Sequence, residues 1–289
     1  MHGGSIDYKQ KDAGLAEIIL STVIWGSIPL FSIWSALPSP VFVFFRVLIS
    51  AAVLYVILRK DINSDISSLL NPYVVLSGIL LAANWVFLFY AVNIIPVSEA
   101  IIFYYSGPVI AILLSPLLKE KITRSAGIGI GIAFSGIILM SAGNLNLNPL
   151  GIISAILSGI TYGILSVVSK HSTECVKPLN LVFFQVLLSA IILSPSLFLL
   201  KFTFTSDDIV IAVFSAIVQT VIALFLWYDS MKKIKVQAVS ILSYLDPVFA
   251  IVFALIFLDQ VPDSFTIGGG VLLIVSGAFT TASTMRKTD

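Results

Sequence analysis

The stretch VFFRVLISA, residues 43–51, returns at residues 182–190 as VFFQVLLSA, with seven of the nine positions identical. The charged residue of the first copy, Arg46, is replaced by Gln185 in the second. Both copies lie inside long apolar segments, so the match is not a polar motif shared by two surface loops. The match indicates that the chain contains two copies of one unit, and the repeat decides how the rest of the sequence is interpreted.

The composition is that of a membrane protein. The chain has 289 residues, of which 58% are hydrophobic and 11% charged, and its mean hydropathy is +1.06. A soluble domain is about 25% charged. Membrane helices carry few charges because each one at the bilayer centre costs roughly 2.5–3.5 kcal/mol. A net charge of +1 argues against a nucleic-acid-binding protein, which needs a basic face.

Ten apolar segments are long enough to cross the hydrocarbon, which takes about 20 residues of helix. We predict all of them to be helices because open sheet edges are not tolerated in lipid. The predicted spans are residues 15–33, 40–58, 72–91, 98–118, 125–142, 149–168, 179–200, 208–228, 236–258 and 265–283.

Loop charges predict the orientation of these spans. If the N-terminus is cytoplasmic, 14 of the 16 basic residues fall on the inside, Lys201 lies outside and Arg46 lies within a span. We therefore expect a multi-pass protein of the plasma membrane with both termini in the cytoplasm. The polar residues 1–14 lack the features of a signal peptide, so the first span is expected to be retained.

The repeat extends over the whole chain and is inverted. Three further segment pairs match at nearly the same spacing: IWGS (24–27) with TYGI (161–164), FLFY (87–90) with FLWY (225–228), and GPVIAILLSPLLKE (107–120) with DPVFAIVFALIFLD (246–259). Spans one to five thus correspond to spans six to ten, and an odd number of spans inserts the second copy upside down. The basic loop KEKITR (119–124) corresponds to LDQVPD (258–263), which has no lysine or arginine.

With these features the chain resembles the drug/metabolite transporter superfamily, specifically its ten-helix members with two EamA domains. The resemblance rests on the VFFRVLISA/VFFQVLLSA pair, Trp25-Gly26, and proline-centred spans that end in Glu120 and Asp259. It implies an all-α membrane protein of two inverted five-helix repeats around a central cavity lined mainly by spans 1, 3, 4, 6, 8 and 9. It also implies transport of amino acids or other small organic metabolites, often outward.

The expected organisation follows from this resemblance. Residues 1–14 form a cytoplasmic tail, 15–146 the first EamA repeat, 147–284 the second, and 285–289 a C-terminal tail. The expected partners are a small-molecule substrate and the lipid bilayer. Protons are a candidate coupling ion, and no nucleic acid is expected.

Polar and aromatic residues inside the spans are the candidate substrate site, because polar groups in a membrane are costly unless they serve a function. They are Trp25, Asn84, Trp85, Tyr104, Tyr105, Ser106, Tyr162, Gln219, Ser240, Ser243 and Tyr244. We prefer a hinge and site-lining role for Pro108 and Pro247 over simple packing, because each frees a backbone carbonyl beside tyrosine and serine. For the tryptophans and tyrosines, cavity lining and an interfacial belt are equally compatible with the sequence. Such walls suit a zwitterion or an aromatic solute better than an inorganic ion.

Three charged residues complete the candidate site. Arg46 could be a structural arginine, a gate or a clamp for a substrate carboxylate, and its candidate partners are Asp246 and Glu99. Either carboxyl could instead carry a proton, since an apolar site favours the neutral acid. Asp246 is preferred because Glu99 is expected near the outer mouth.

Enzymatic chemistry is not expected. The sequence contains no phosphate-binding loop, no HExxH motif and no nucleophile motif, so we predict neither a catalytic residue nor a metal or cofactor. Gly127 and Gly131 form a GxxxG motif, for which packing within the chain is preferred over a homodimer face. Two other functions stay open: an organophosphate or nucleotide-sugar exchanger, which would favour several buried basic residues, and a non-transporting scaffold or sensor.

Overall fold

The computed structural model describes residues 8–35, 37–59, 71–95, 100, 103–140, 148–259 and 264–286. Every regular element in these ranges is helical. The first half of the chain contains α1 (Tyr8–Gly26), α2 (Ile28–Trp34), α3 (Ser39–Leu58), α5 (Pro72–Ile94), α7 (Ser106–Leu114), the 3₁₀ helix η2 (Ser115–Leu118) and α8 (Arg124–Met140). The second half contains α9 (Pro149–Cys175), α10 (Pro178–Leu193), α11 (Ser196–Leu199), α12 (Ser206–Phe214), the π-helix η3 (Ser215–Ile222), α13 (Ala223–Lys233), α14 (Val236–Leu242), the 3₁₀ helix η4 (Ser243–Leu245), α15 (Asp246–Leu258) and α16 (Ser264–Arg286).

Helix starts follow local sequence signals. Helices α5 and α9 both begin at an Asn-Pro pair, in which proline needs no hydrogen bond at the first helical position. The side chain of Asn71 accepts from the Tyr73 amide at 2.9 Å, and that of Asn148 accepts from the Leu150 amide at 3.1 Å. These contacts satisfy amides that a helix leaves unpaired at its N-terminus.

The predicted spans are present as helices. Six helical stretches of the described residues are long and apolar enough to cross a membrane: Pro40–Leu58, Pro72–Ala91, Pro149–Cys175, Pro178–Leu199, Ser206–Lys233 and Val236–Phe257. Three shorter apolar helices, Ser106–Leu118, Arg124–Leu139 and Ile267–Ser276, lie at the predicted fourth, fifth and tenth spans. The first predicted span corresponds to α1 and α2, which are separated by a break at Ser27. The predicted all-α membrane fold is confirmed.

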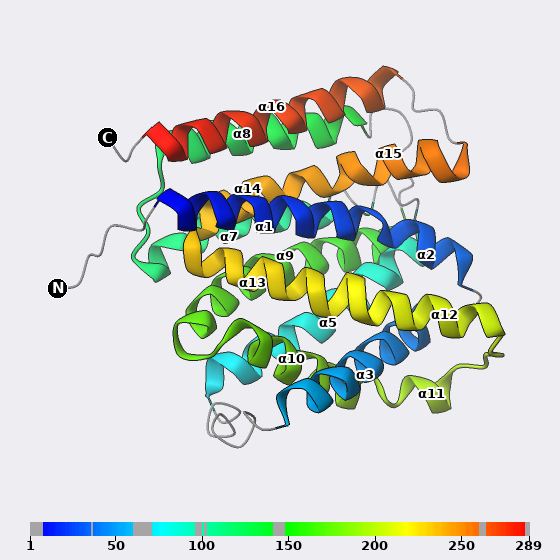
Figure 1. Cartoon of the computed structure of the whole chain (residues 1–289). Helices are drawn as coiled ribbons and strands as arrows, with labels where there is room; N and C mark the ends of the chain where they lie inside the picture. Colours follow the sequence, from blue (N-terminus) through cyan, green and yellow to red (C-terminus); the bar gives the residue numbers. More distant parts are fainter. Residues whose placement is uncertain are drawn as a thin grey trace.

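The helices run side by side in one elongated bundle (Figure 1). Helices α8 and α16 pack together at one edge of the bundle, and α3 and α10 pack together at the opposite edge. Helices α1, α5, α7, α9 and α13 to α15 lie between these edges. Helix α1 begins and α16 ends at the same end of the bundle, as an even number of crossings requires.

The two halves pack with an internal two-fold relation. A Cβ added to Gly26 would lie 3.1 Å from the carbonyl oxygen of Asp246, and one added to Gly163 would lie 2.8 Å from that of Gly107. Gly26 matches Gly163 in the repeat, and Asp246 matches Gly107. The contact of Gly26 with the Asp246 backbone and that of Gly163 with the Gly107 backbone are therefore equivalent by the repeat. In both, glycine lets two helices of opposite halves approach closely.

A second pair of contacts repeats this relation. The hydroxyl of Ser50 on α3 donates to the carbonyl of Ala216 at 2.9 Å, and that of Ser189 on α10 donates to the carbonyl of Gly78 at 3.5 Å. These residues also occupy matching repeat positions. Both halves thus fasten their second span to the third span of the other half.

The GxxxG motif of α8 does not pack inside the chain. A Cβ added to Gly127 or Gly131 would meet no other atom within 4 Å, and both residues are exposed. The preference for internal packing is therefore wrong. Instead, Gly136 faces α16, where an added Cβ would lie 2.8 Å from the carbonyl of Gly269.

Candidate functional site

Four of the central spans depart from a regular α-helix in their middle. Helix α1 ends at Gly26 and α2 starts at Ile28, and a turn at Tyr105 precedes α7, which begins at Ser106. The eighth span contains the π-helix η3, and the ninth contains the 3₁₀ helix η4 directly before Asp246. Prolines contribute to the irregularities of α7 and α15, because Pro108 and Pro247 cannot donate to the preceding turn. Interrupted helices leave backbone groups free to bind side chains or solutes.

The π-helix presents a backbone acceptor to the first and second spans. The carbonyl of Gln219 accepts a hydrogen bond from Trp25 Nε1 at 3.0 Å and another from Arg46 Nη2 at 2.8 Å. Arg46 Nε donates to the hydroxyl of Thr220, which in turn donates to the carbonyl of Ser215 at 3.0 Å, five residues earlier. The π-helix η3 thus supplies both hydrogen-bond acceptors of Arg46.

Arg46 is buried without a carboxylate. It is 2% exposed, and its guanidinium carbon lies 5.0 Å from the centre of the Trp85 ring, a cation–π distance. No ion pair to Arg46 is present among the described residues. The Arg46–Asp246 pair considered from the sequence is therefore not formed, and Glu99 lies outside the described residues.

A column of aromatic rings crosses the interface between the two halves. Trp25 of α1 lies 5.8 Å from Trp227 of α13, which lies 6.1 Å from Tyr162 of α9, measured between ring centres. Tyr162 stacks on Tyr104 at 5.3 Å. We call the residues Trp25, Trp227, Tyr162, Tyr104, Tyr105 and Tyr244 the aromatic column.

The column ends at Asp246. Tyr105 lies 5.1 Å from Tyr104 and donates its hydroxyl to Asp246 Oδ2 at 2.8 Å. Tyr244, at the matching repeat position of Tyr105, lies 5.6 Å from it and donates to its carbonyl at 2.7 Å. Asp246 is half-buried and makes no ion pair among the described residues.

The other predicted site residues have more local partners. Asn84 donates to the carbonyl of Ser158 at 2.8 Å and thereby fastens α5 to α9. The hydroxyls of Ser106 and Ser243 donate to carbonyls three and four residues earlier in the chain. Ser240 is 2% exposed, and its hydroxyl has no partner among the described residues. Gln219 donates from its side chain to Ser27 Oγ at 2.9 Å, while its buried Oε1 has no partner in the part of the chain that the structure describes.

Sequence reasoning missed Trp227. The residue is 1% exposed, it joins two rings of the aromatic column, and no described residue accepts a hydrogen bond from its buried Nε1. The repeat contained a signal, because the segments FLFY and FLWY differ at one position, where Phe89 becomes Trp227. The substitution adds a single N–H donor.

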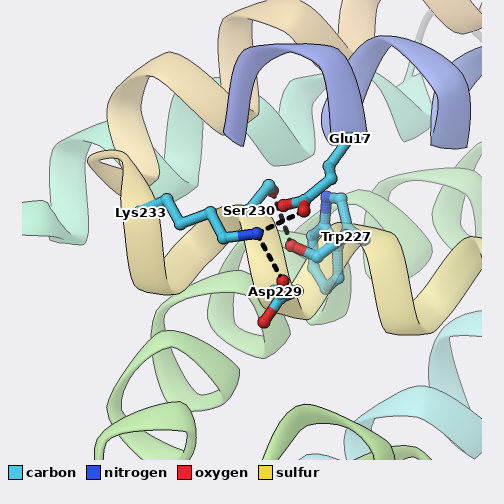
Figure 2. A network of polar contacts seen from close by, with 5 residues as sticks. All are labelled: Glu17, Trp227, Asp229, Ser230 and Lys233. Atoms are coloured by element: carbon cyan, nitrogen blue, oxygen red, sulfur yellow. Dashed lines mark hydrogen bonds and ion pairs between the residues drawn. The ribbon is translucent and has the colours of Figure 1, made fainter. Parts of the chain in front are cut away.

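A polar network fastens α1 to α13 at the end of the bundle where α1 begins (Figure 1). Figure 2 shows Glu17 of α1 reaching Lys233, which also binds Asp229 one helical turn away. The three side chains are each about one-fifth exposed, at 18–23%. Ser230 donates to the Trp227 carbonyl at 2.7 Å in the same turn.

Two further groups bind the α13–α14 junction. Lys170 of α9 donates to the carbonyl of Ile234 at 3.2 Å and to that of Met231. Glu120, in the loop before α8, accepts from the amide of Val236 at 3.3 Å. Burial raises the pKa of the Glu120 carboxyl, and the nearby Lys170 charge opposes that shift. Together with α1, which binds Lys233 through Glu17, helix α9 and the loop before α8 thus contact the same junction of the second half.

The chain consists of two matching halves of apolar helices. Several of these helices are interrupted, and aromatic rings and charges without an ion-pair partner lie at the interruptions. This combination is typical of membrane transporters built from inverted repeats. A family model described as the EamA-like transporter family matches residues 13–142 and 149–282. The chain belongs to this family, within the drug/metabolite transporter superfamily, as the resemblance indicated.

Known proteins agree with this membership. "Uncharacterized transporter YxxF" of Bacillus subtilis (strain 168) is 30% identical, over 99% of this chain and 94% of that protein. The "Pseudopaline exporter CntI" of Pseudomonas aeruginosa is 25% identical, over 84% of this chain and 86% of that protein. One solved crystal structure superimposes with a TM-score of 0.81 over 96% of this chain and 99% of its own length, at 20% identity, and so supports the fold.

Proposed function

We propose that the protein is a secondary transporter that moves small organic metabolites, with amino acids as the substrate class, across the plasma membrane. The observation that carries the proposal is the aromatic column between the halves, flanked by Arg46 and Asp246 where the helices are interrupted. Midplane sites at repeat interfaces are where inverted-repeat transporters bind their substrates. Both termini are proposed to be cytoplasmic, in keeping with the loop charges. The proposed direction of transport is outward, as the family resemblance implies.

Alternating access of the two halves is the proposed mechanism. It is supported by the polar contacts of Glu17 with Lys233 and of Glu120 with the Val236 amide, because each joins the first half to the second and can hold one end of the bundle closed. The matching position of Glu17 in the other half is Ser154, and that of Lys233 is Ile95, so the opposite end lacks this ion pair. Breaking the contacts would let the halves rock around the site. Pro108 and Pro247 are the proposed hinges.

An organophosphate or nucleotide-sugar exchanger is the less favoured function. Phosphate groups are bound through several charge-assisted hydrogen bonds. Among the fully buried described residues, Arg46 is the only basic one. A non-transporting scaffold is disfavoured by membership in a transporter family.

Transport in proteoliposomes tests the proposal. Purified protein should exchange at least one labelled amino acid from a panel that also contains sugars, organic acids and phosphate esters. Asp246→Asn should reduce this exchange while the unfolding temperature in detergent stays close to that of the wild type. The proposal fails if folded wild-type protein exchanges no member of the panel. Exchange with and without a pH gradient distinguishes proton coupling from uniport.

A further inference from the structure

We infer that the substrate is a zwitterion, whose carboxylate is bound by Arg46 and whose ammonium group is bound by Asp246. The inference rests on the proposed transport function and adds the charge class of the substrate. It also gives Arg46 one of the three roles that the sequence left open.

Arg46 has the properties of an anion site. A buried charge is normally paired, because desolvation of a lone ion is costly. The recorded bonds of Arg46 use Nε and Nη2, to a hydroxyl and a carbonyl, and neither acceptor is charged. Nη1 has no hydrogen-bond partner among the described residues. A guanidinium fixed in this way can still receive a carboxylate, for which its geometry is suited.

Asp246 has the properties of an ammonium site. Its one recorded side-chain partner is the neutral hydroxyl of Tyr105. The neighbouring rings of the aromatic column, those of Tyr104 and Tyr105, are uncharged. A carboxylate in such surroundings favours a cation, and no basic side chain of the described residues pairs with it.

The repeat has a neutral residue at the position that matches each charge. The position that matches Arg46 is Gln185, whose side chain accepts from Tyr228 and donates to Ser169 Oγ at 3.3 Å. The position that matches Asp246 is Gly107. Each half has a neutral residue at the place where the other half has a charge, and Gln185 bonds within its own half whereas Arg46 bonds to the other half. The two charges are thus additions to a symmetric scaffold, and they have opposite signs.

The two charges flank the same interrupted segment of α1. Trp25 shares the carbonyl of Gln219 with Arg46, and the next residue, Gly26, packs against the backbone of Asp246. A solute between the halves at this level can therefore meet both charges. A cation alone would leave Arg46 without a counter-charge, and an anion alone would leave Asp246 without one. A zwitterion neutralises both.

Competitive exchange from one mixture tests the charge class. Proteoliposomes are loaded with amino acids, their carboxamides, which are cations at pH 7, and their N-acetyl derivatives, which are anions. Efflux of each compound is measured by mass spectrometry, and protein-free liposomes correct for leakage. The wild type should export amino acids at least about tenfold faster than either derivative, since a charged hydrogen bond contributes enough for such a preference.

Two neutralised variants assign the charges. Arg46→Gln, which places the residue of the matching position at this site, should abolish the preference over carboxamides but keep that over N-acetyl derivatives. Asp246→Asn should do the reverse. Lys201→Gln and Asp207→Asn, which neutralise exposed residues outside the column, should change neither ratio. If Arg46→Gln does not fold, Arg46→Lys keeps the charge and should retain the preference over carboxamides.

Three results would overturn the inference. Equal export of all three classes by the wild type excludes a zwitterion site. Equal slowing of all three classes in a folded Arg46→Gln protein assigns Arg46 a structural role instead. Absence of any efflux refutes the transport function itself, and the zwitterion site with it.

Discussion

Alanine at Gly163 should separate two helices of opposite halves, and alanine at Gly26 should do the same at the matching contact. The added Cβ of Gly163 would lie 2.6 Å from the Cβ of Ile110, and that of Gly26 would lie 2.6 Å from the Cβ of Phe249. Carbon atoms pack best at about 3.5–4.0 Å, so each helix pair must open by about 1 Å. Overpacking of this kind typically costs about 1–3 kcal/mol.

Helix propensity partly offsets this cost, because alanine is about 1 kcal/mol better than glycine inside a helix. We therefore expect a net loss of up to about 2 kcal/mol for Gly163→Ala and a similar loss for Gly26→Ala, against a gain of about 1 kcal/mol where the added Cβ meets nothing. Gly131→Ala is the matched control, because an added Cβ meets nothing within 4 Å there. Reversible unfolding in mixed detergent, followed by circular dichroism, measures the three variants. The two-fold packing of the halves would be refuted if Gly163→Ala were as stable as Gly131→Ala.

Three further substitutions test the polar contacts and the unpaired tryptophan. Lys233→Ala should lower the free energy of unfolding by about 1 kcal/mol, and by less at high salt because the ion pairs are partly exposed. Lys232→Ala, which removes an exposed lysine, should leave the free energy of unfolding unchanged. Equal unfolding temperatures of the two variants would contradict a stabilising role for the network. Glu120→Gln keeps an acceptor for the Val236 amide and removes the carboxyl. Because burial raises the pKa of this carboxyl, its ionisation at higher pH destabilises the folded protein of the wild type. Relative to the wild type, this variant should therefore gain stability as the pH rises above the usual pKa of a glutamate carboxyl, and a constant difference in unfolding temperature would argue against burial of the charge. Trp227→Phe removes a buried donor that has no partner, so the unfolding temperature should stay equal or rise while substrate exchange slows; unchanged exchange would exclude this indole from the site.

The sequence predicted the architecture because the bilayer imposes simple constraints on it. A span must be apolar over about 20 residues, and an odd-numbered repeat must invert, so segment length and loop charge suffice. The break between α1 and α2 has a local signal in Gly26, Ser27 and Pro29 that the prediction of the first span did not use. The π-helix at Ser215–Ile222 contains no proline or glycine and was not predicted, and it decides what Arg46 binds.

The candidate site was predicted as a set of residues but not as a set of contacts. Depth in a span indicated that Tyr104, Tyr162 and Asp246 were unusual, and the structure brings them near one another through ring contacts and Tyr105. Opposite charge suggested a bond between Arg46 and Asp246, whereas a freed carbonyl and a hydroxyl hold Arg46 instead. A charge partner can be guessed from sequence, but an acceptor created by backbone geometry cannot.

The glycines show the same limit on sequence reasoning. The GxxxG spacing of Gly127 and Gly131 pointed to close packing, yet both face away from the rest of the chain. Gly159 and Gly163 form a second GxxxG, and both of these glycines do make close contacts with the other half, as does Gly26, which has no such spacing. Spacing identifies a smooth helix face but not the neighbour that covers it.

Counterflow tests the central claim, that the two halves form a transporter with its site between them, most directly. Proteoliposomes preloaded with an unlabelled amino acid mixture are diluted into trace labelled amino acid, and internal label is followed over time. Internal label should rise transiently above equilibrium for at least one amino acid, and Asp246→Asn should strongly reduce this accumulation. Folded wild-type protein that gives no accumulation for any amino acid or other metabolite of the panel would contradict the claim.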